Sequence, residues 1–200
     1  MNKRSLFIFL LLAFVLTFTS IPAFPYTIEQ ITPKGNYTYE NSGVYLGTVI
    51  GENDSIAVLE GVLAQLGYIV DVVTSSKVDA PATSSPAGSD FPLYMTYIDG
   101  NKSGTWATFQ PAESPLGAAL VDYYVVKGAN EFALYLVDGP AAQGTWNVEN
   151  LRTHNGENNP TISHLSAYDP PPNTVPEPVC LLLLGLGLVG LAGVQRKINK

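Results

Sequence analysis

The chain has few of the residue types that build disulfide frameworks and metal sites. Its 200 residues include one cysteine, Cys180, and two histidines, His154 and His164. One cysteine excludes a disulfide framework and a cysteine-rich zinc site. Two histidines ten residues apart do not form the paired helical motif of a zinc protease. The sequence therefore predicts neither a metal nor another cofactor.

Basic residues are also scarce, and half of them lie at the two ends of the chain. Ten Lys or Arg side chains stand against 17 Asp or Glu, which gives a net charge of −7. The segment from residue 24 to 178 keeps all 17 acidic side chains but only five basic ones, a net charge of −12. Nucleic acid is not expected as a partner, because its phosphates require clustered Lys and Arg.

Long apolar runs occur only near the ends, and the first has the features of an export signal. Residues 6–18 contain 12 apolar side chains out of 13, after a start that carries Lys3 and Arg4. A proline-broken stretch then leads to the small residue Ala23. This order predicts a secretory signal peptide over residues 1–23. The alternative is an uncleaved anchor, for which this run is short against a bilayer core of about 30 Å.

The second apolar run, residues 179–194, predicts a transmembrane helix. It holds 12 apolar residues and four glycines. As a helix this run spans about 24 Å, enough for a thin or locally deformed bilayer. Arg196, Lys197 and Lys200 follow as stop-transfer charges and place residues 195–200 in the cytoplasm. With the signal peptide directing export, residues 24–169 form an ectodomain outside the inner membrane.

A proline-rich stalk, residues 170–178, connects the ectodomain to this helix and ends in the motif Val175, Pro176, Glu177 and Pro178. The motif, the glycine-punctuated apolar segment and the basic end together resemble the PEP-CTERM sorting signal of exopolysaccharide-producing Gram-negative bacteria. The resemblance covers only the C-terminal end of the chain, from Val175 onward. It implies that an exosortase, a membrane-embedded cysteine protease, recognises Pro176, Glu177 and Pro178 and removes the tail after export. The alternative is a proline-rich stalk before a permanent anchor.

The exported segment has mostly a two-residue apolar period, broken by Gly, Pro, Asn and Asp, which is typical of strands. We expect a mainly β fold: a single jelly-roll-like β-sandwich over residues 24–169. Residues 74–92, rich in Ser, Thr and Pro, are expected to form a flexible loop or a domain boundary. The predicted strands are residues 37–39, 44–50, 69–74, 93–98, 105–109, 119–127, 132–136, 145–148 and 162–168.

One stretch has helical spacing instead. Apolar residues recur three and four apart, with a capping residue before them and Gly67 after them. The sequence therefore predicts one short amphipathic helix with Asn53, Asp54 or Ser55 at its start. The apolar positions are Ile56, Leu59, Val62, Leu63 and Leu66.

A short internal repeat suggests two β-hairpins. Residues 97–106 and 136–146 each carry an apolar strand, an Asp-Gly turn and then Gly-Thr-Trp. Trp106 and Trp146 would thus occupy equivalent places. The interpretation we favour is that both fill the core, because aromatic side chains dominate core burial. The alternative is that they point outward and stack on sugar rings of a polysaccharide.

No nucleophile elbow, phosphate loop or helical histidine-glutamate motif is present. The leading hypothesis is therefore a non-enzymatic surface or extracellular-matrix protein associated with exopolysaccharide or biofilm. A carbohydrate-binding module is the alternative, and a polysaccharide hydrolase with a Ser-His-Asp or carboxylate site is a third hypothesis.

His164 is expected to be a partly buried strand residue bonded to a neighbour. Acidic residues near predicted turns are expected to form turns or caps rather than weak calcium sites; they are Glu52, Asp54, Asp99 and Asp138.

Overall fold

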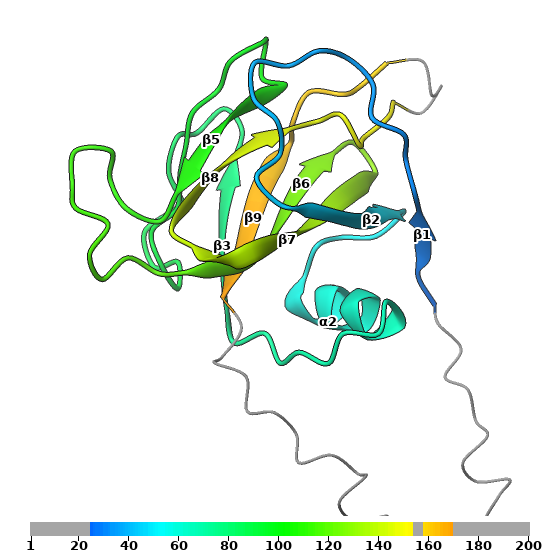
Figure 1. Cartoon of the computed structure of the whole chain (residues 1–200), viewed down its shortest axis with the longest axis horizontal. Coiled ribbons are helices and arrows are strands. Elements are labelled where there is room, and N and C mark those ends of the chain that lie inside the picture. The colour runs from blue at the N-terminus through cyan, green and yellow to red at the C-terminus, as the bar shows by residue number, and fades with distance from the viewer. Residues whose placement is uncertain (1–24, 154–157, 170–200) are drawn as a thin grey trace, which may run out of the picture.

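The fold is mainly β, with two antiparallel sheets and one short helix (Figure 1). A computed structural model of the chain describes residues 25–153 and 158–169. The larger sheet has six strands, in the spatial order β1 (Thr27–Glu29), β2 (Val44–Ile50), β7 (Glu131–Ala141), β6 (Val121–Gly128), β9 (His164–Asp169) and β3 (Thr74–Asp79). The smaller sheet contains β4 (Tyr94–Met95), β5 (Ser103–Ala107) and β8 (Gln143–Asn147).

The main core lies between the two sheets. Alternate residues of β6 and β7, such as Val126 and Ala133, share one buried cluster with Trp106 and Trp146 of the smaller sheet. Strand alternation sends the intervening residues, such as Val125, to the opposite face. The larger sheet therefore buries apolar side chains on both of its faces.

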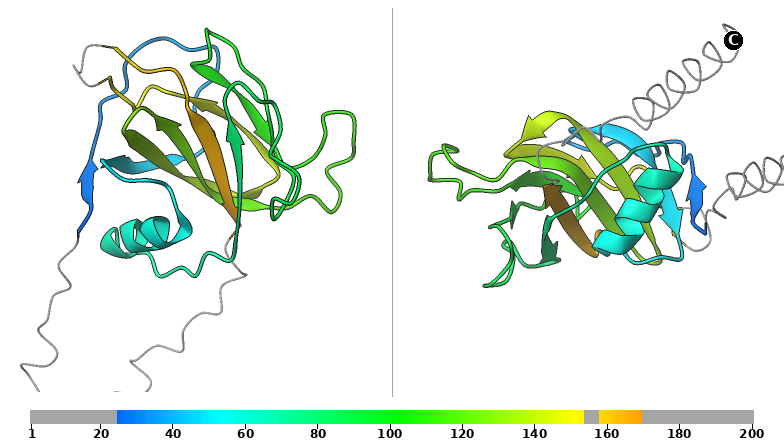
Figure 2. Two further views of the ribbon diagram at one scale, coloured as in Figure 1. Left: turned by 180° about the vertical axis from the view of Figure 1, so that it is seen from behind. Right: turned by 90° about the horizontal axis from the view of Figure 1, so that it is seen from below.

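The helix α2 (Ile56–Gln65) covers that opposite face (Figure 2). Leu59, Val62 and Leu63 are fully buried there, in a second apolar cluster that also contains Val125, which confirms the predicted amphipathic helix. Of the three candidate caps, Ser55 is the residue whose side chain accepts from the backbone N–H of Val58. Gly67, just past the helix, has a φ of +89°, the left-handed conformation that favours glycine after a helix.

Several strand predictions are confirmed, whereas others are wrong. The predicted strands over 44–50, 105–109, 119–127, 132–136, 145–148 and 162–168 overlap β2, β5, β6, β7, β8 and β9. Residues 37–39 form no strand, and of residues 93–98 only Tyr94–Met95 does. β1 has no counterpart among the predicted strands.

The predicted junction between a strand over residues 69–74 and a loop over residues 74–92 is also wrong. Residues 69–73 lie outside any strand, whereas β3 occupies the first part of the predicted loop over residues 74–92. Ile69 is 82% exposed and Val73 is 57% exposed, whereas Val70 and Val72 pack in the cluster under α2, so burial alternates along this segment although it pairs with no strand. In β3 the buried positions are Ser76 and Val78, and a buried serine leaves no apolar signal in the sequence.

The first predicted hairpin is confirmed and the second is not. Ile98 pairs with Ser103 across a turn in which Asp99, Gly100 and Asn101 all have positive φ. In contrast, residues 138–139 lie inside β7, where the pairing with β6 skips from Leu136 to Ala141. The chain bulges there, and β8 pairs with β5 instead of folding back on β7.

Candidate functional site

Strand β9 presents a row of polar side chains on one face of the larger sheet. His164, Ser166 and Tyr168 alternate with Leu165 and Ala167, so the two sets point to opposite faces. Leu165 and Ala167 enter the core between the sheets, and Tyr168 belongs to the cluster under the helix. The strand therefore carries hydrogen-bonding groups into a region that the loop before α2 covers.

That loop supplies Asp54, which binds all three polar side chains. Asp54 Oδ1 lies 2.8 Å from His164 Nε2, and Oδ2 accepts from the Ser166 hydroxyl at 2.5 Å. The Tyr168 hydroxyl donates to the Asp54 backbone carbonyl. All four side chains are buried. We name these four residues the Asp54 cluster.

The electrostatics of the Asp54 cluster favour an ionised carboxylate. Burial raises the pKa of Asp54, but the hydrogen bond and charge of His164 and the hydrogen bond of Ser166 outweigh it and lower that pKa to about 2. Burial, with the nearby Asp54 charge, raises the pKa of the Tyr168 hydroxyl, which therefore stays a neutral donor.

Two further charged groups flank the cluster. His164 Nδ1 lies 3.6 Å from Asp79 Oδ1, so both ring nitrogens face carboxylate oxygens. Lys127, the strand partner of His164 on β6, directs its Nζ to the Glu52 carbonyl at 2.8 Å. Burial lowers the pKa of Lys127, while the charges of Asp54 and Glu52 act in the opposite direction. The Lys127 ammonium therefore lies near the acidic side chains of Asp54 and Glu52.

The Asp54 cluster contains the residue types of a serine hydrolase triad but not its geometry. In such a triad the serine hydroxyl bonds to the histidine, which the acid orients from the far side. Here Ser166 and His164 bond to the two oxygens of one carboxylate, so the serine proton points at the acid. The arrangement does not activate Ser166 as a nucleophile. Its hydrogen bonds instead hold the loop before α2 against β9.

The expectation for His164 is confirmed, and that for Asp54 is corrected. His164 is a buried strand residue whose ring bonds a neighbour. Asp54 caps no helix, because Ser55 occupies that position. Asp99 does have a turn role: its carboxylate accepts from Ser103 and from the backbone and side chain of Thr38.

Trp106 and Trp146 lie in the core, as the favoured interpretation predicts. They are 1% and 0% exposed, so the alternative in which they point outward and stack on sugars is wrong. Neither indole N–H has a hydrogen-bond partner among the described residues. Burying these large aromatic surfaces outweighs the cost of two unpaired donors.

The repeated Gly-Thr-Trp segments explain how both indoles fit. They pair with each other in antiparallel register, with Trp106 opposite Gly144 and Trp146 opposite Gly104. A Cβ at position 144 would lie 2.7 Å from the Trp106 ring, and one at 104 would lie 2.9 Å from Trp146 Nε1. Each glycine therefore leaves room for the tryptophan of the facing strand.

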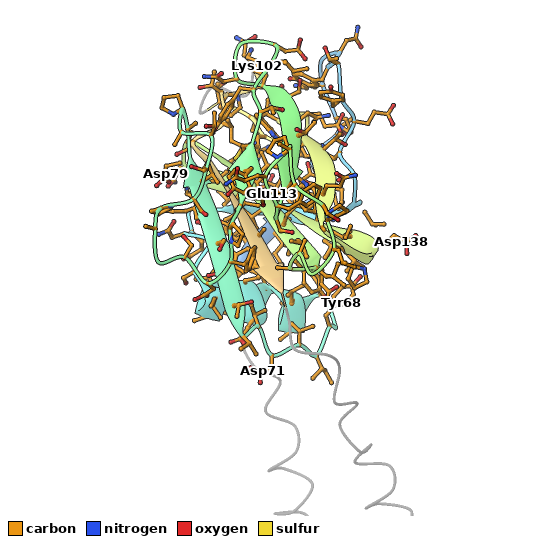
Figure 3. All side chains as sticks on the ribbon, turned by 90° about the vertical axis from the view of Figure 1, so that its left-hand side faces the viewer. Tyr68, Asp71, Asp79, Lys102, Glu113 and Asp138 are labelled. Atoms are coloured by element: carbon orange, nitrogen blue, oxygen red, sulfur yellow. The ribbon has the colours of Figure 1, made fainter. Side chains whose placement is uncertain are left out.

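A groove opens between two loops beside β4. It comprises two adjoining hollows of about 430 and 380 Å³, which both contact Phe91, Pro92, Tyr94 and Gln110. Residues 84–92 form one wall, and residues 108–119 form the other. We name it the loop groove. Glu113, on its second wall, is labelled in Figure 3.

The residues of the predicted sorting and membrane segments lie outside the described part of the chain. These are the motif Val175, Pro176, Glu177 and Pro178 and the charges Arg196, Lys197 and Lys200. Within residues 25–153 and 158–169, no helix has the length and apolar character needed to cross a membrane. The same residues contain no group of three or more His, Cys, Asp or Glu arranged for a metal ion.

Sequence reasoning misses the Asp54 cluster and the loop groove. The alternation of His164, Ser166 and Tyr168 signals that one face of a strand is polar, but nothing local shows that Asp54, 110 residues away, lies opposite. The wall at residues 84–92 belongs to the stretch predicted as a flexible loop. Comparison of the chain with protein-family models, with curated proteins and with solved structures finds no match.

Proposed function

We propose that this chain is an exported, non-enzymatic surface or extracellular-matrix protein with a PEP-CTERM sorting signal. In this proposal residues 1–23 direct export, residues 179–194 hold the chain in the inner membrane, and an exosortase cleaves near Pro176, Glu177 and Pro178. The observation that carries it is the order of motif, apolar segment and basic end over positions 175–200. After processing, the ectodomain stays in or near the exopolysaccharide layer.

The position of the domain ends supports a tethered ectodomain. Strand β1 begins and β9 ends at the same end of the molecule, on the side where α2 lies (Figures 1 and 2). Asp71 marks this end in Figure 3. A domain whose two ends leave on one side can be joined to a membrane there while its opposite side faces outward.

We also propose that the two sheets form one jelly-roll-like β-sandwich. A single buried cluster contains residues of both sheets, such as Trp106 and Leu165, which supports one domain. The chain passes from β7 of the larger sheet directly into β8 of the smaller one, as expected when two sheets share a core. Such a domain is large enough to stay folded after its ends are removed.

The lack of enzymatic activity is supported by the Asp54 cluster. Its serine is 3% exposed and donates to a carboxylate, so it is neither accessible nor activated by the histidine. A hydrolase would shorten the host's own polysaccharide, whereas a structural or binding protein leaves polymer length unchanged. Size-exclusion chromatography of that polymer after incubation with the purified chain distinguishes the two.

Mass spectrometry of the chain from its host tests the sorting proposal. Molecules recovered from the cell surface are expected to lack residues 179–200, whereas membrane-bound precursors keep them. A Pro176→Ala, Pro178→Ala double variant should accumulate as the precursor, while Asn173→Ala, in the stalk before the motif, should be processed normally. An intact C-terminus on every surface molecule contradicts the proposal.

A further inference from the structure

We propose that the loop groove binds a neutral polysaccharide chain. The two hollows share four contacting residues and therefore adjoin each other on the same side of the domain. Each hollow has a volume within the range of about 300–1,000 Å³ that is usual for ligand sites. Two adjoining open hollows suit successive units of an extended polymer better than one compact small molecule.

The groove is lined in part by flat apolar side chains. Phe91, Pro92 and Tyr94 contact both hollows, and Phe109 contacts the second. Tyr94 and Phe109 are only half-buried, so parts of their rings remain accessible. Rings of this kind pack against the apolar C–H faces of sugars, and a tyrosine adds a polar hydroxyl.

The walls of the groove carry uncharged hydrogen-bonding groups. Ser84, Ser85 and Ser89 line the first hollow, Ser114 lines the second, and Gln110 contacts both. Serine hydroxyls and a glutamine amide donate and accept, which matches sugar hydroxyls that do the same. The aromatic rings and the hydroxyl and amide groups together favour a saccharide over an apolar ligand.

The charges of the groove select against acidic polymers. Among the described residues that line it, the charged ones are Asp90 and Glu113, and none is Lys, Arg or His. A uronate, sulfate or phosphate group entering the groove would face two carboxylates without a counter-charge. The structure therefore favours neutral sugars.

Hydrogen bonds hold both walls in place before any ligand binds. The Ser85 N–H donates to the Leu93 carbonyl, and the Leu93 N–H donates back to the Ser85 hydroxyl oxygen. The Thr108 hydroxyl donates to the Ala119 carbonyl at 2.6 Å and closes the base of the second loop. Binding to an ordered groove avoids much of the entropy cost of arranging loops.

Affinity gel electrophoresis of the full chain in mild detergent tests this inference. Gels containing a soluble β-glucan, a galactomannan or a dextran serve as neutral probes, and alginate serves as the acidic probe. At least one neutral polymer is expected to slow migration, while alginate should not. Gln110→Ala is expected to weaken that retardation about tenfold, because it removes an exposed amide that contacts both hollows.

Gln143→Ala is the matched control, because Gln143 is an exposed amide on β8 that does not line the groove. It should leave retardation within about twofold of the wild type. Tyr94→Ala is a second groove variant, with its folding checked by tryptophan fluorescence. Failure of every neutral polymer to slow the chain, stronger retardation by alginate, or unchanged binding of Gln110→Ala overturns the inference. Because purified chain is used, these results do not depend on whether the tail is processed.

Discussion

Asp54 concentrates more buried polar contacts than any neighbouring side chain of its loop. Its carboxylate accepts from His164 and Ser166, and its backbone carbonyl accepts from Tyr168. A buried carboxylate is costly unless each oxygen is bonded, and here both are. The three donors belong to one strand, and loss of the Asp54 carboxylate would deprive the buried His164 ring and Ser166 hydroxyl of their shared partner at once.

We predict that Asp54→Asn lowers the free energy of unfolding by about 2–3 kcal/mol at neutral pH. The pKa of Asp54 is about 2 in the folded chain against 3.8 normally. Ionisation of this group therefore stabilises the fold fully above about pH 4, and the stabilisation is lost as pH falls towards 2. Urea unfolding followed by tryptophan fluorescence between pH 7 and pH 2.5 measures both effects. The two tryptophans of the chain are both buried in the domain, so the signal reports its unfolding.

The exposed Asp138 provides the control for this prediction. Asp138→Asn should change the unfolding free energy by less than about 0.5 kcal/mol. Wild type and Asp54→Asn should differ less at pH 2.5 than at pH 7. Equal destabilisation at both pH values would show that Asp54 contributes through packing alone.

Gly104 is a second residue at which a small substitution affects stability, because there is no room for a Cβ atom. A Cβ there would lie 1.8 Å from the Thr96 carbonyl oxygen, a backbone atom that cannot rotate away. At Gly144 the nearest atom is the Ser42 hydroxyl at 2.1 Å, a side-chain atom, with the Trp106 ring at 2.7 Å. The two equivalent glycines of the repeat therefore differ in how far their surroundings can adjust.

We predict that Gly104→Ala destabilises the domain by about 3 kcal/mol and Gly144→Ala by less, because overpacking against backbone is harder to relieve. Urea unfolding measures the two values. Ser42→Gly combined with Gly144→Ala should recover part of the loss at position 144. The reverse order of the two single variants would contradict the geometry of the tryptophan repeat.

Among the elements, α2 is the one that local residues alone identify. Its apolar spacing, its capping serine and its closing glycine all lie between Ser55 and Gly67, so no distant contact is needed to recognise it. We predict that Ser55→Ala lowers stability by about 1 kcal/mol through loss of the side-chain bond to the Val58 N–H. Ser55→Asn should keep most of that stability, as an asparagine oxygen replaces the hydroxyl. Urea unfolding of the two variants checks this, and equal losses would exclude a capping role.

The strands are harder to predict than the helix, for a physical reason. The central strands β6 and β7 bury residues on both faces and are rich in Val, Tyr and Leu, so their composition reveals them. In β3 one of the two buried positions is Ser76, whose hydroxyl accepts from the backbone N–H of Phe91 across a loop. A polar residue at a buried position weakens the apolar pattern of the strand. The second Asp-Gly pair also resembles a turn, yet which strand β8 joins depends on the facing tryptophans rather than on local residues.

For the molecule as a whole, sequence indicates class and charge but not which distant segments meet. A mainly β domain with one helix follows from periodicity, and the burial of both tryptophans follows from their size. The Asp54 cluster joins residues 110 or more positions apart, and the loop groove joins two loops that are adjacent only after β4 and β5 pair. Such contacts depend on strand order, which apolar patterns do not encode.

The uneven distribution of charge gives a last prediction about the whole chain. The intact chain has a net charge of −7 and an isoelectric point near 4.7. Removal of residues 1–23 takes away Lys3 and Arg4 and leaves −9, whereas removal of the tail after residue 178 as well leaves −12. The charged side chains that each processing step removes are all positive, so the isoelectric point falls at each of the two steps.

Isoelectric focusing of chain from the membrane and from the cell surface should therefore separate precursor from product. We expect the surface form to focus below the membrane form, because it lacks Arg196, Lys197 and Lys200. The variant with alanine at positions 176 and 178 should give only the less acidic band. A surface form that focuses with the membrane form would mean that the basic end is retained, and it would contradict removal of the tail even if the domain binds polysaccharide.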